Sequence, residues 1–459
     1  MPKISVYTPT YNCARYLKTA INSILKQTYQ DFELIIIDDA SSDNTCDILD
    51  DYKNNPKIKI FRNEKNIGFV RSAIRAIEKA NGEYIMRLDA DDYLDENALF
   101  VMANILDNHP EFGMVYPDYF EIDEKGNIID YFRKNKIGEE IKLMDLPANG
   151  ACTLMRKSCY KSIGGYRDDI RMQDKYDIWI KFLKKFEPYN VNLPLFYYRR
   201  HGGNISNNAK KILQTRRYIK EKFIEKKYKK TKPKILAIIP TRAKFPIYSD
   251  FPIRKIAGKP LIYYPIRAIK GISLIKKAIF VTEDKDLAKE AKKHNIETMI
   301  RPEELATSRI GIEPTIKYVL NQVKKKNKFI PDIVVILFIT SPLITSEHVK
   351  AAIDTLMIYD ADSIISVQED KRFHHKHGRY GLEPIFEKRL LRQEKDLLFE
   401  EIGSLVVTKR KFITDKNLFG KKIGHIALAD EEAIDIDNKF KFWLAEQIIK
   451  NRNKINKLT

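Results

Sequence analysis

Short, continuously apolar segments recur along this chain, and each is followed by a polar turn and then by residues with helical periodicity. In the first 90 residues these segments are ISVYTPT, FELIIID, KIKIFRN and EYIMRLD. Apolar runs of this length are typical of strands buried on both faces of a parallel sheet. We expect helices between them near residues 13–28, 43–54 and 69–80. The pattern predicts an α/β fold, in which ligands bind where the parallel strands end.

The same rhythm starts again in the second half of the chain. The segments ILAIIPT, KKAIFVTED, DIVVILFITS and DSIISVQ predict four more buried strands, and we expect an amphipathic helix after each of them. A chain of 459 residues exceeds the size at which one core keeps growing. The sequence therefore predicts two Rossmann-like α/β domains, at residues 1–208 and 234–459.

A basic segment, residues 209–233, joins the two predicted domains. From residue 209 to 234, 12 of 26 residues are Lys or Arg. Ile212, Ile219 and Phe223 recur at helical spacing, so we expect a helix with one apolar side. That side either packs against the first domain or rests on an anionic membrane surface, and the sequence leaves both interpretations open.

The formal net charge of +20 favours anionic partners, such as nucleotide phosphates, an anionic membrane or nucleic acid. Nucleic-acid binding would need a basic face interleaved with aromatic residues. The basic residues instead concentrate in the linker, so we expect no nucleic-acid partner. No apolar run approaches the roughly 20 residues of a membrane span, and the N-terminus lacks the apolar region of a signal peptide. We expect a cytoplasmic protein, either free or peripherally bound to the inner face of the cell membrane.

Carboxylates are dense after two strands of the first half, at 38–43 and 89–92. One carboxylate is enough to cap the helix that follows, and we expect Asp43 to do so. Three carboxylates directly after a buried strand are costly unless a cation is present. Hard divalent cations prefer oxygen ligands and neutralise the charge of a leaving diphosphate. The pattern therefore predicts a metal and diphosphate site where these strands end.

The blocks PTYN, IIIDDASSD, NIG and RLDADD occur in that order and resemble the inverting glycosyltransferases of family 2, which have the GT-A fold. The resemblance covers about residues 3–206. It implies that Asp89 and Asp91 form a DxD motif, which holds Mg²⁺ or Mn²⁺ and the diphosphate of a nucleotide-sugar donor. It also implies a nucleotide-sugar pocket lined by Thr8, Tyr11, Asp39 and Asn66.

Later blocks extend the resemblance. NGACTLMRKSCYKSIGGYRDD resembles the acceptor-side segment of the family, with a turn at Gly164 and Gly165, and MQDKYDIWIKF resembles its catalytic-base segment. Inversion needs one carboxylate that takes a proton from the acceptor hydroxyl. We assign this role to Asp174 and expect the alternative, Asp177, to be a structural residue of the helix. YYRRHGG resembles the closing segment, so we expect His201 to approach the metal or the diphosphate.

The resemblance implies transfer of a sugar to a glycan or lipid-linked acceptor during synthesis of a cell-surface polysaccharide or glycoconjugate. A different class of function, a membrane-associated nucleotide-binding scaffold, is the alternative. The intact carboxylates Asp89, Asp91 and Asp174 argue against that alternative for the first domain. We expect substrate specificity to depend on pocket walls from residues 95–150, where the sequence contains no decodable motif.

The second half contains IIPTR, IAGKPLIYY, VTEDKDLAK, RPEELAT, ITSPL, DSIISV and IDID, and resembles the cytidylyltransferases that make CMP-sialic acid. The resemblance implies attack of a sugar hydroxyl on CTP and a homodimer formed through this domain. Asp435 and Asp437 would bind Mg²⁺, although Asp437 is also placed to cap the next helix. Arg242 matches an arginine of the loop that wraps the triphosphate, and Lys244 is a second basic candidate in that loop.

That loop departs from the family pattern. It reads TRAKFPIYSDFPIRKIAGKP, with Ala243, Lys244 and Ile247 where glycines are expected. Glycines allow backbone N–H groups to approach a phosphate, and the prolines at 246 and 252 offer no N–H. Three interpretations follow for residues 234–459. They form a degenerate domain that binds or scaffolds, the second activity of a bifunctional enzyme that makes a CMP-activated acidic sugar, or a domain with another nucleotide chemistry.

Overall fold

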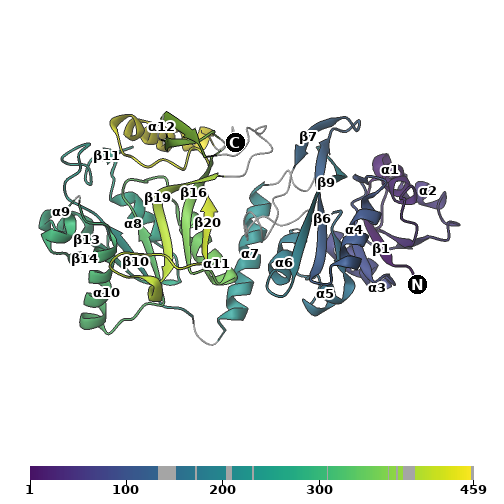
Figure 1. Cartoon of the computed structure of the whole chain (residues 1–459), viewed down its shortest axis with the longest axis horizontal. Coiled ribbons are helices and arrows are strands. Elements are labelled where there is room, and N and C mark those ends of the chain that lie inside the picture. The colour runs from purple at the N-terminus through teal and green to yellow at the C-terminus, as the bar shows by residue number, and fades with distance from the viewer. Residues whose placement is uncertain are drawn as a thin grey trace. The chain divides into compact units, whose positions relative to one another are not determined.

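The computed structural model describes residues 1–132, 151–170, 173–202, 209–229, 232–307, 309–370, 372–378, 381–385 and 398–455. The chain divides into two compact units, Met1–Lys220 and Glu221–Thr459. Each unit is an α/β fold with one large sheet, as predicted (Figure 1). The segment 133–150, which includes much of the expected pocket wall, lies outside the described residues.

The first unit contains a nine-stranded sheet with the order β3-β2-β1-β4-β8-β6-β9-β5, in which β7 pairs with β6. The four predicted strands are parallel: β1 (Ile4–Thr10), β2 (Phe32–Asp38), β3 (Ile58–Arg62) and β4 (Tyr84–Arg87). Every residue of β1, β2 and β4 is buried. The remaining strands are β5 (Tyr93–Leu94), β6 (Phe112–Ile122), β7 (Ile128–Phe132), β8 (Leu154–Arg156) and β9 (Glu187–Arg199).

Helices cover both faces of this sheet, because alternate residues of each strand point to opposite sides. Ile4 and Val6 of β1 join one core, with α1 (Ala14–Leu25), α2 (Thr45–Asp50) and α4 (Ala98–Asn108). Tyr7 joins the opposite core, with α3 (Phe69–Lys79), α5 (Lys157–Ser162) and α6 (Asp174–Phe182). The helices predicted near 13–28, 43–54 and 69–80 are α1, α2 and α3.

The basic segment forms α7 (Ala209–Lys227). Arg216 and Lys220 lie over the ring of Tyr176 in α6, with 5.0 and 5.8 Å to its centroid. Ile219 is fully buried. This arrangement favours the interpretation in which the apolar side of the helix packs on protein. No helix within the described part of the chain is both long and apolar enough to cross a bilayer.

The second unit has the strand order β14-β13-β10-β15-β19-β16-β20. Its parallel strands are β10 (Ile235–Pro240), β13 (Ile275–Thr282), β14 (Glu297–Ile300) and β15 (Ile333–Leu337). The strand β19 (Leu398–Lys409) runs antiparallel to β15 and β16 (Ser363–Asp370), and β20 (Ile423–Ala427) lies parallel to β16. Its α-helices are α8 (Tyr263–Ile269), α9 (Lys285–Lys292), α10 (Glu313–Asn327), α11 (Ser346–Tyr359) and α12 (Lys439–Ile455).

One prediction for this unit is wrong. Helices follow β10, β13 and β15, but the next described elements after β16 are the hairpin strands β17 (His375–Gly378) and β18 (Gly381–Pro384). The physical reason is that β16 pairs with an antiparallel strand, β19, and antiparallel neighbours need no helical crossover. The periodicity of DSIISVQ does not distinguish these two cases.

Candidate functional site

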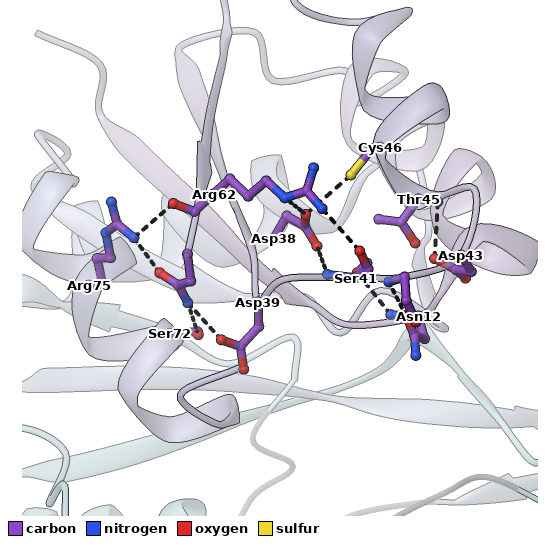
Figure 2. A network of polar contacts seen from close by, with 12 residues as sticks. Asn12, Asp38, Asp39, Ser41, Asp43, Thr45, Cys46, Arg62, Ser72 and Arg75 are labelled. Atoms are coloured by element: carbon purple, nitrogen blue, oxygen red, sulfur yellow. Dashed lines mark hydrogen bonds and ion pairs between the residues drawn. The ribbon is translucent and has the colours of Figure 1, made fainter. Parts of the chain in front are cut away.

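The loops that follow β1, β2 and β3 are tied together by a network of polar contacts (Figure 2). Its centre is Asp39, which is 3% exposed. The carboxylate accepts N–H groups from Ile67 at 2.9 Å and Gly68 at 2.8 Å, and from the side chain of Asn63 at 2.7 Å. A carboxylate has about four acceptor positions. Three of those of Asp39 therefore hold the loop before α3, and one is left.

The loop after β1 is joined to the loop after β2 through Asn12, which adopts a left-handed backbone conformation with φ of 50°. Its N–H donates to Ser41 Oγ at 3.0 Å, and its own Oδ1 accepts the N–H of Ser42 at 2.8 Å. Asp43 accepts the backbone N–H of Thr45 at 3.0 Å and of Ala14 at 3.1 Å. The predicted capping carboxylate thus serves the first residues of two helices, α2 and α1.

Asp38, the last residue of β2, is 1% exposed and orders the same loop. It accepts the N–H of Ser41 at 3.1 Å and lies 3.2 Å from Nε of Arg62. Arg62 in turn donates to the carbonyl of Ser41 at 3.0 Å. These contacts are drawn in Figure 2. They tie the loop after β2 to Arg62, the last residue of β3.

Four carboxylates gather at the end of β4. Asp91 lies 2.9 Å from Nε2 of His201, and Asp92 accepts the backbone N–H of Arg199 at 2.8 Å. Burial, with Asp91 and Asp89 beside it, raises the pKa of Asp92 well above its usual range. Burial also raises the pKa of Asp89, and repulsion from Asp91 and Asp174 raises it further. Arg87 lowers this pKa but does not cancel the increase. The site is therefore short of positive charge.

Arg87 links two of these carboxylates. Its Nε lies 2.8 Å from Asp89 Oδ1, and its Nη2 donates to Asp89 Oδ2 at 3.0 Å. Its Nη1 donates to Asp174 Oδ2 at 2.7 Å. Asp174, the first residue of α6, is 6% exposed. The assigned base and the first residue of the DxD motif thus share one guanidinium.

The start of α6 is held from two sides. Gln173, the residue before it, has a left-handed backbone with φ of 59°, and its side chain accepts a hydrogen bond from Nε of Arg216 at 2.8 Å. Asp177 is fully buried and pairs with Lys181 one turn later. Asp177 also lies 3.8 Å from Nη1 of Arg167, away from the DxD carboxylates. Its contacts are those of a structural residue.

The remaining predicted pocket residues differ in exposure. Thr8 is 1% exposed, and its Oγ1 has no hydrogen-bond partner among the described residues. Tyr11 is 47% exposed and Asn66 is exposed. The turn at Gly164 and Gly165 is confirmed, with φ of 81° and 57°.

The donor set at the end of β4 fits a divalent cation. Asp89 and Asp91 are partly accessible, with side-chain exposures of 25% and 22%, and Oδ2 of buried Asp92 has no hydrogen-bond partner among the described residues. Within the described ranges, no group of three or more His, Cys, Asp and Glu side chains is arranged to hold a metal by itself. A cation here would therefore need oxygen atoms from a bound diphosphate or from water.

Sequence reasoning missed several residues that organise this site: Asn12, Asn63, Arg87, Arg199 and Arg216. Asn12 and Arg87 stand within the matched blocks PTYN and RLDADD, and Asn63 ends the predicted strand segment KIKIFRN. Their signal was a charged or amide side chain at the end of an otherwise apolar strand. Arg216 carried no local signal, because its contact to Gln173 spans 43 residues.

In the second unit, a cavity of about 250 Å³ lies where β10 and β15 end, lined by Arg242, Arg301 and Thr340 among others. Asp435 lies beside it: Oδ1 accepts from Ser341 Oγ at 3.3 Å. Lys244 is exposed and is not among the described residues that line the cavity.

The sequence also placed Asp437 to cap the next helix, α12, and this prediction is wrong. The side chain of Asn438 caps this helix, by accepting the N–H of Lys441 at 2.9 Å. Asp437 instead lies 2.7 Å from Nζ of Lys441, and its side chain is 58% exposed. Asp435 and Asp437 alternate with buried Ile434 and Ile436, so they share one side of an extended segment.

The expected triphosphate loop is occupied by an aromatic cluster. Phe251 is fully buried, with its ring centroid 4.7 Å from that of Phe245 and 6.4 Å from that of Phe442 in α12. Tyr248 packs edge-on to Phe442 at 5.5 Å. Arg254 is held 2.8 Å from Asp250 and 3.8 Å from the centroid of the Tyr248 ring. The loop therefore contributes apolar packing where phosphate donors were expected.

Comparison with known proteins follows this division. The family description Glycosyl transferase family 2 matches residues 5–164, and the description Cytidylyltransferase matches residues 236–423. EpsE of Bacillus subtilis (strain 168) is 32% identical over 208 residues, which cover 43% of this chain and 73% of EpsE. An uncharacterized glycosyltransferase of Rickettsia typhi is 32% identical over 235 residues, which cover 49% of this chain and 72% of that protein.

The chondroitin synthase of Escherichia coli is 30% identical over 208 residues, which cover 45% of this chain and only 30% of the synthase. Among solved structures, residues 1–349 of S. aureus TarS in complex with UDP-GlcNAc match with a TM-score of 0.42 and 21% identity. That match covers 48% of this chain and 66% of the TarS chain.

Proposed function

Because the chain belongs to glycosyl transferase family 2, we propose that residues 1–208 move a hexose-type sugar, with inversion, from a nucleotide-sugar donor to a glycan or lipid-linked acceptor. The observation that carries the proposal is the placement of Asp174 beside Asp89, with both carboxylates on Arg87. A base and a diphosphate site must lie this close for a single displacement.

The donor nucleotide would lie over the loops after β1, β2 and β3. Asp39 keeps one acceptor position for an N–H of the base or a hydroxyl of the ribose, because its other three positions are taken by Asn63, Ile67 and Gly68. The buried Oγ1 of Thr8 has no described partner and can serve a polar atom of the donor. Exposed Tyr11 and Asn66 would cover the nucleotide from the solvent side.

Asp89 and Asp91 would hold Mg²⁺ or Mn²⁺, which supplies positive charge to the departing diphosphate. His201, at 2.9 Å from Asp91, orients that carboxylate. Asp174 accepts the proton of the acceptor hydroxyl as the hydroxyl oxygen attacks the anomeric carbon. The buried start of α6 keeps water away from this carboxylate, which favours transfer over hydrolysis.

A polysaccharide or another surface glycoconjugate is the acceptor class that we propose. The support is the similarity to a protein named chondroitin synthase, which covers the same half of the chain. The test is a panel of UDP-, GDP- and dTDP-sugars with Mn²⁺ and the full chain, read as release of nucleoside diphosphate. NMR of the product would report inversion. If no donor is turned over, with or without glycan acceptors, the proposal fails.

For residues 234–459 we propose binding or scaffolding rather than efficient cytidylyl transfer. The observation is the buried aromatic cluster around Phe251, which occupies the loop that would wrap a triphosphate. Charge-assisted hydrogen bonds contribute about 1.5–3 kcal/mol each, so losing three of them weakens the interaction with the triphosphate by about 4–9 kcal/mol. The second candidate, a bifunctional enzyme, keeps support from Asp435, Asp437 and Arg242.

Incubation of the full chain with CTP, Mg²⁺ and a panel of nonulosonic acids separates these two candidates. Release of pyrophosphate at an ordinary turnover rate would reject the binding role. A homodimer through the second unit, which the sequence resemblance implies, is tested on the same sample by light scattering.

A further inference from the structure

Arg87 is an unusual residue for the end of a central strand. It is the last residue of β4 and is 7% exposed, and its guanidinium lies 4.6 Å from the centroid of the Phe69 ring in α3. A buried arginine is costly unless its charge and its N–H groups are matched. Apolar residues of similar volume stabilise a core as well as such an ion pair does or better. Fold stability alone therefore does not account for Arg87.

The three guanidinium nitrogens of Arg87 contact two carboxylates that come from distant parts of the chain. Nε and Nη2 lie 2.8 and 3.0 Å from the two oxygens of Asp89, which comes two residues later. Nη1 lies 2.7 Å from Asp174, which comes 87 residues later. A planar guanidinium with donors on both sides can span two carboxylates, whereas the ammonium of a lysine is a point charge.

The surroundings restrict this side chain to one geometry. Phe69 covers one face of the guanidinium. The hydroxyl of Tyr166 is 2.9 Å from the hydroxyl of Tyr7 in β1. Burial and the nearby Asp174 raise the pKa of Tyr166 to about 12, so it remains a neutral phenol. Arg87 is a neighbour of this phenol and opposes the rise of its pKa, so the guanidinium is bordered by Phe69 and Tyr166 as well as by Asp89 and Asp174.

We propose that Arg87 is the positioning residue of glycosyl transfer in this protein: it fixes Asp174 beside Asp89 and shares its charge between the base side and the donor side of the site. The inference rests on the proposed function, because it takes Asp174 as the base and Asp89 as a ligand of the cation. Arg87 touches neither acceptor nor donor in this role, and it acts through the two carboxylates.

Two opposite effects follow from one side chain. Arg87 places a positive charge against Asp89, so it opposes binding of a divalent cation there. The same charge holds Asp174 in place, so it favours proton removal. Replacing Arg87 by an uncharged residue should therefore strengthen binding of the metal and weaken turnover. A residue that only supports the fold would weaken both or neither.

The test uses the full chain and Mn²⁺ alone as the binding probe, with free Mn²⁺ measured by electron paramagnetic resonance. For Arg87→Met we expect Mn²⁺ to bind about threefold to tenfold more tightly, because a like charge is removed. We expect kcat to fall about 100-fold or more, with KM for the donor changed less than about threefold, because base placement acts on the chemical step. Arg87→Lys keeps the charge, so Mn²⁺ affinity should stay near the wild-type value while kcat still falls about tenfold.

Arg452→Met is the matched control, because Arg452 pairs with Glu432 in the second unit and is not part of the proposed glycosyl-transfer site. It should change neither Mn²⁺ affinity nor kcat.

Unchanged Mn²⁺ affinity in Arg87→Met would overturn the inference. If Arg87→Met does not fold, wild-type kcat in Arg87→Lys would overturn it instead. Asp91→Asn distinguishes a failure of the proposed metal site from a failure of the inference about Arg87. If Asp91→Asn binds Mn²⁺ normally, the proposed metal site is wrong and the inference falls with it. If Asp91→Asn loses Mn²⁺ while Arg87→Met binds as wild type, only the inference falls.

Discussion

The carboxylate of Asp91 lies 2.9 Å from Nε2 of His201, although 110 residues separate them in the chain. Asp91 follows the central strand β4, and His201 follows the long strand β9. The pair joins the turn after β4 to the residues that follow β9, the last strand of the first unit. It also gives the DxD carboxylate a fixed orientation, which a side chain on a polar turn would otherwise lack.

Asp91→Asn should lower metal-dependent turnover by about 1000-fold or more, because it removes a charged ligand where charge develops on the leaving diphosphate. His201→Ala should cost about 10–100-fold, the usual effect of losing a partner that orients a metal ligand. The measurement is release of nucleoside diphosphate at a series of Mn²⁺ concentrations. Asp107→Asn, which alters a surface pair with Lys3, is the control and should retain turnover.

Asp174→Asn should reduce kcat by about 1000-fold while donor binding persists, since a general base contributes about 10²–10⁴. Calorimetry with donor and Mn²⁺ reports binding, and product release reports chemistry. Asp177→Asn should lower the melting temperature, because Lys181 loses a buried partner, yet leave turnover of the folded protein intact. Normal transfer by the Asp174→Asn protein would remove Asp174 from the role of base.

Asn63→Ala should weaken donor binding by about tenfold, because Asp39 loses a hydrogen bond of 2.7 Å. We expect this bond to contribute about 1–2 kcal/mol to holding the carboxylate in its binding position. The loss should appear in KM rather than in kcat, because the nucleotide is bound alike in ground and transition states. Asn55→Ala, in the turn before β3, is the control. Equal KM for wild type and Asn63→Ala would show that the Asp39 network does not serve the donor.

Glu33→Gln should destabilise the first unit in a pH-dependent manner. Glu33 is 5% exposed and accepts from Ser5 Oγ, from the N–H of Asn81 and from Lys59, each at 2.6 Å. Burial raises the pKa of Glu33, but the bonds from Lys59, Ser5 and Asn81 outweigh it and leave the pKa lowered. A lowered folded-state pKa stabilises the protein above the unfolded value, near pH 4.3, and this stability is lost as the pH falls further.

We therefore expect Glu33→Gln to cost about 2 kcal/mol in the free energy of unfolding at pH 7. The difference from wild type should shrink as the pH falls below about 4.3. Urea denaturation across pH 3–8 measures it. A difference that stays constant down to pH 3 would contradict the assignment to the charged form of Glu33.

Phe251→Ala should destabilise the second unit by about 3–5 kcal/mol, the usual cost of emptying a buried phenylalanine site. It should not restore pyrophosphate release from CTP, because the missing N–H groups stay missing. Ile253→Ala, at a residue that is 48% exposed, should cost less than about 0.5 kcal/mol. Thermal unfolding measures the loss of stability, and a pyrophosphate assay measures turnover of CTP. A gain of turnover in Phe251→Ala would mean that the aromatic cluster only blocks an intact triphosphate site.

Local pattern was sufficient for much of the fold. The strands ISVYTPT and FELIIID are β1 and β2 because their apolar runs suit burial on both faces, and the one helix between them, α1, begins at Ala14, next to the predicted start near residue 13. The same reasoning failed after DSIISVQ, since an apolar strand looks the same whether its neighbour runs parallel or antiparallel. Register and strand direction depend on partners that are distant in the sequence, as in the pairing of Ser363 in β16 with Thr408 in β19.

The sequence by itself determined the two α/β units, eight of their strands and the carboxylates Asp39, Asp89, Asp91 and Asp174, which all stand in recognisable motifs. Tertiary structure decided how those side chains are used. It put Asp174 on the same guanidinium as Asp89, His201 against Asp91, and Phe251 into a core where phosphate donors were expected. The physical reason is that hydrophobic periodicity is a local property, whereas a charge is matched by whatever the fold brings within about 3 Å of it.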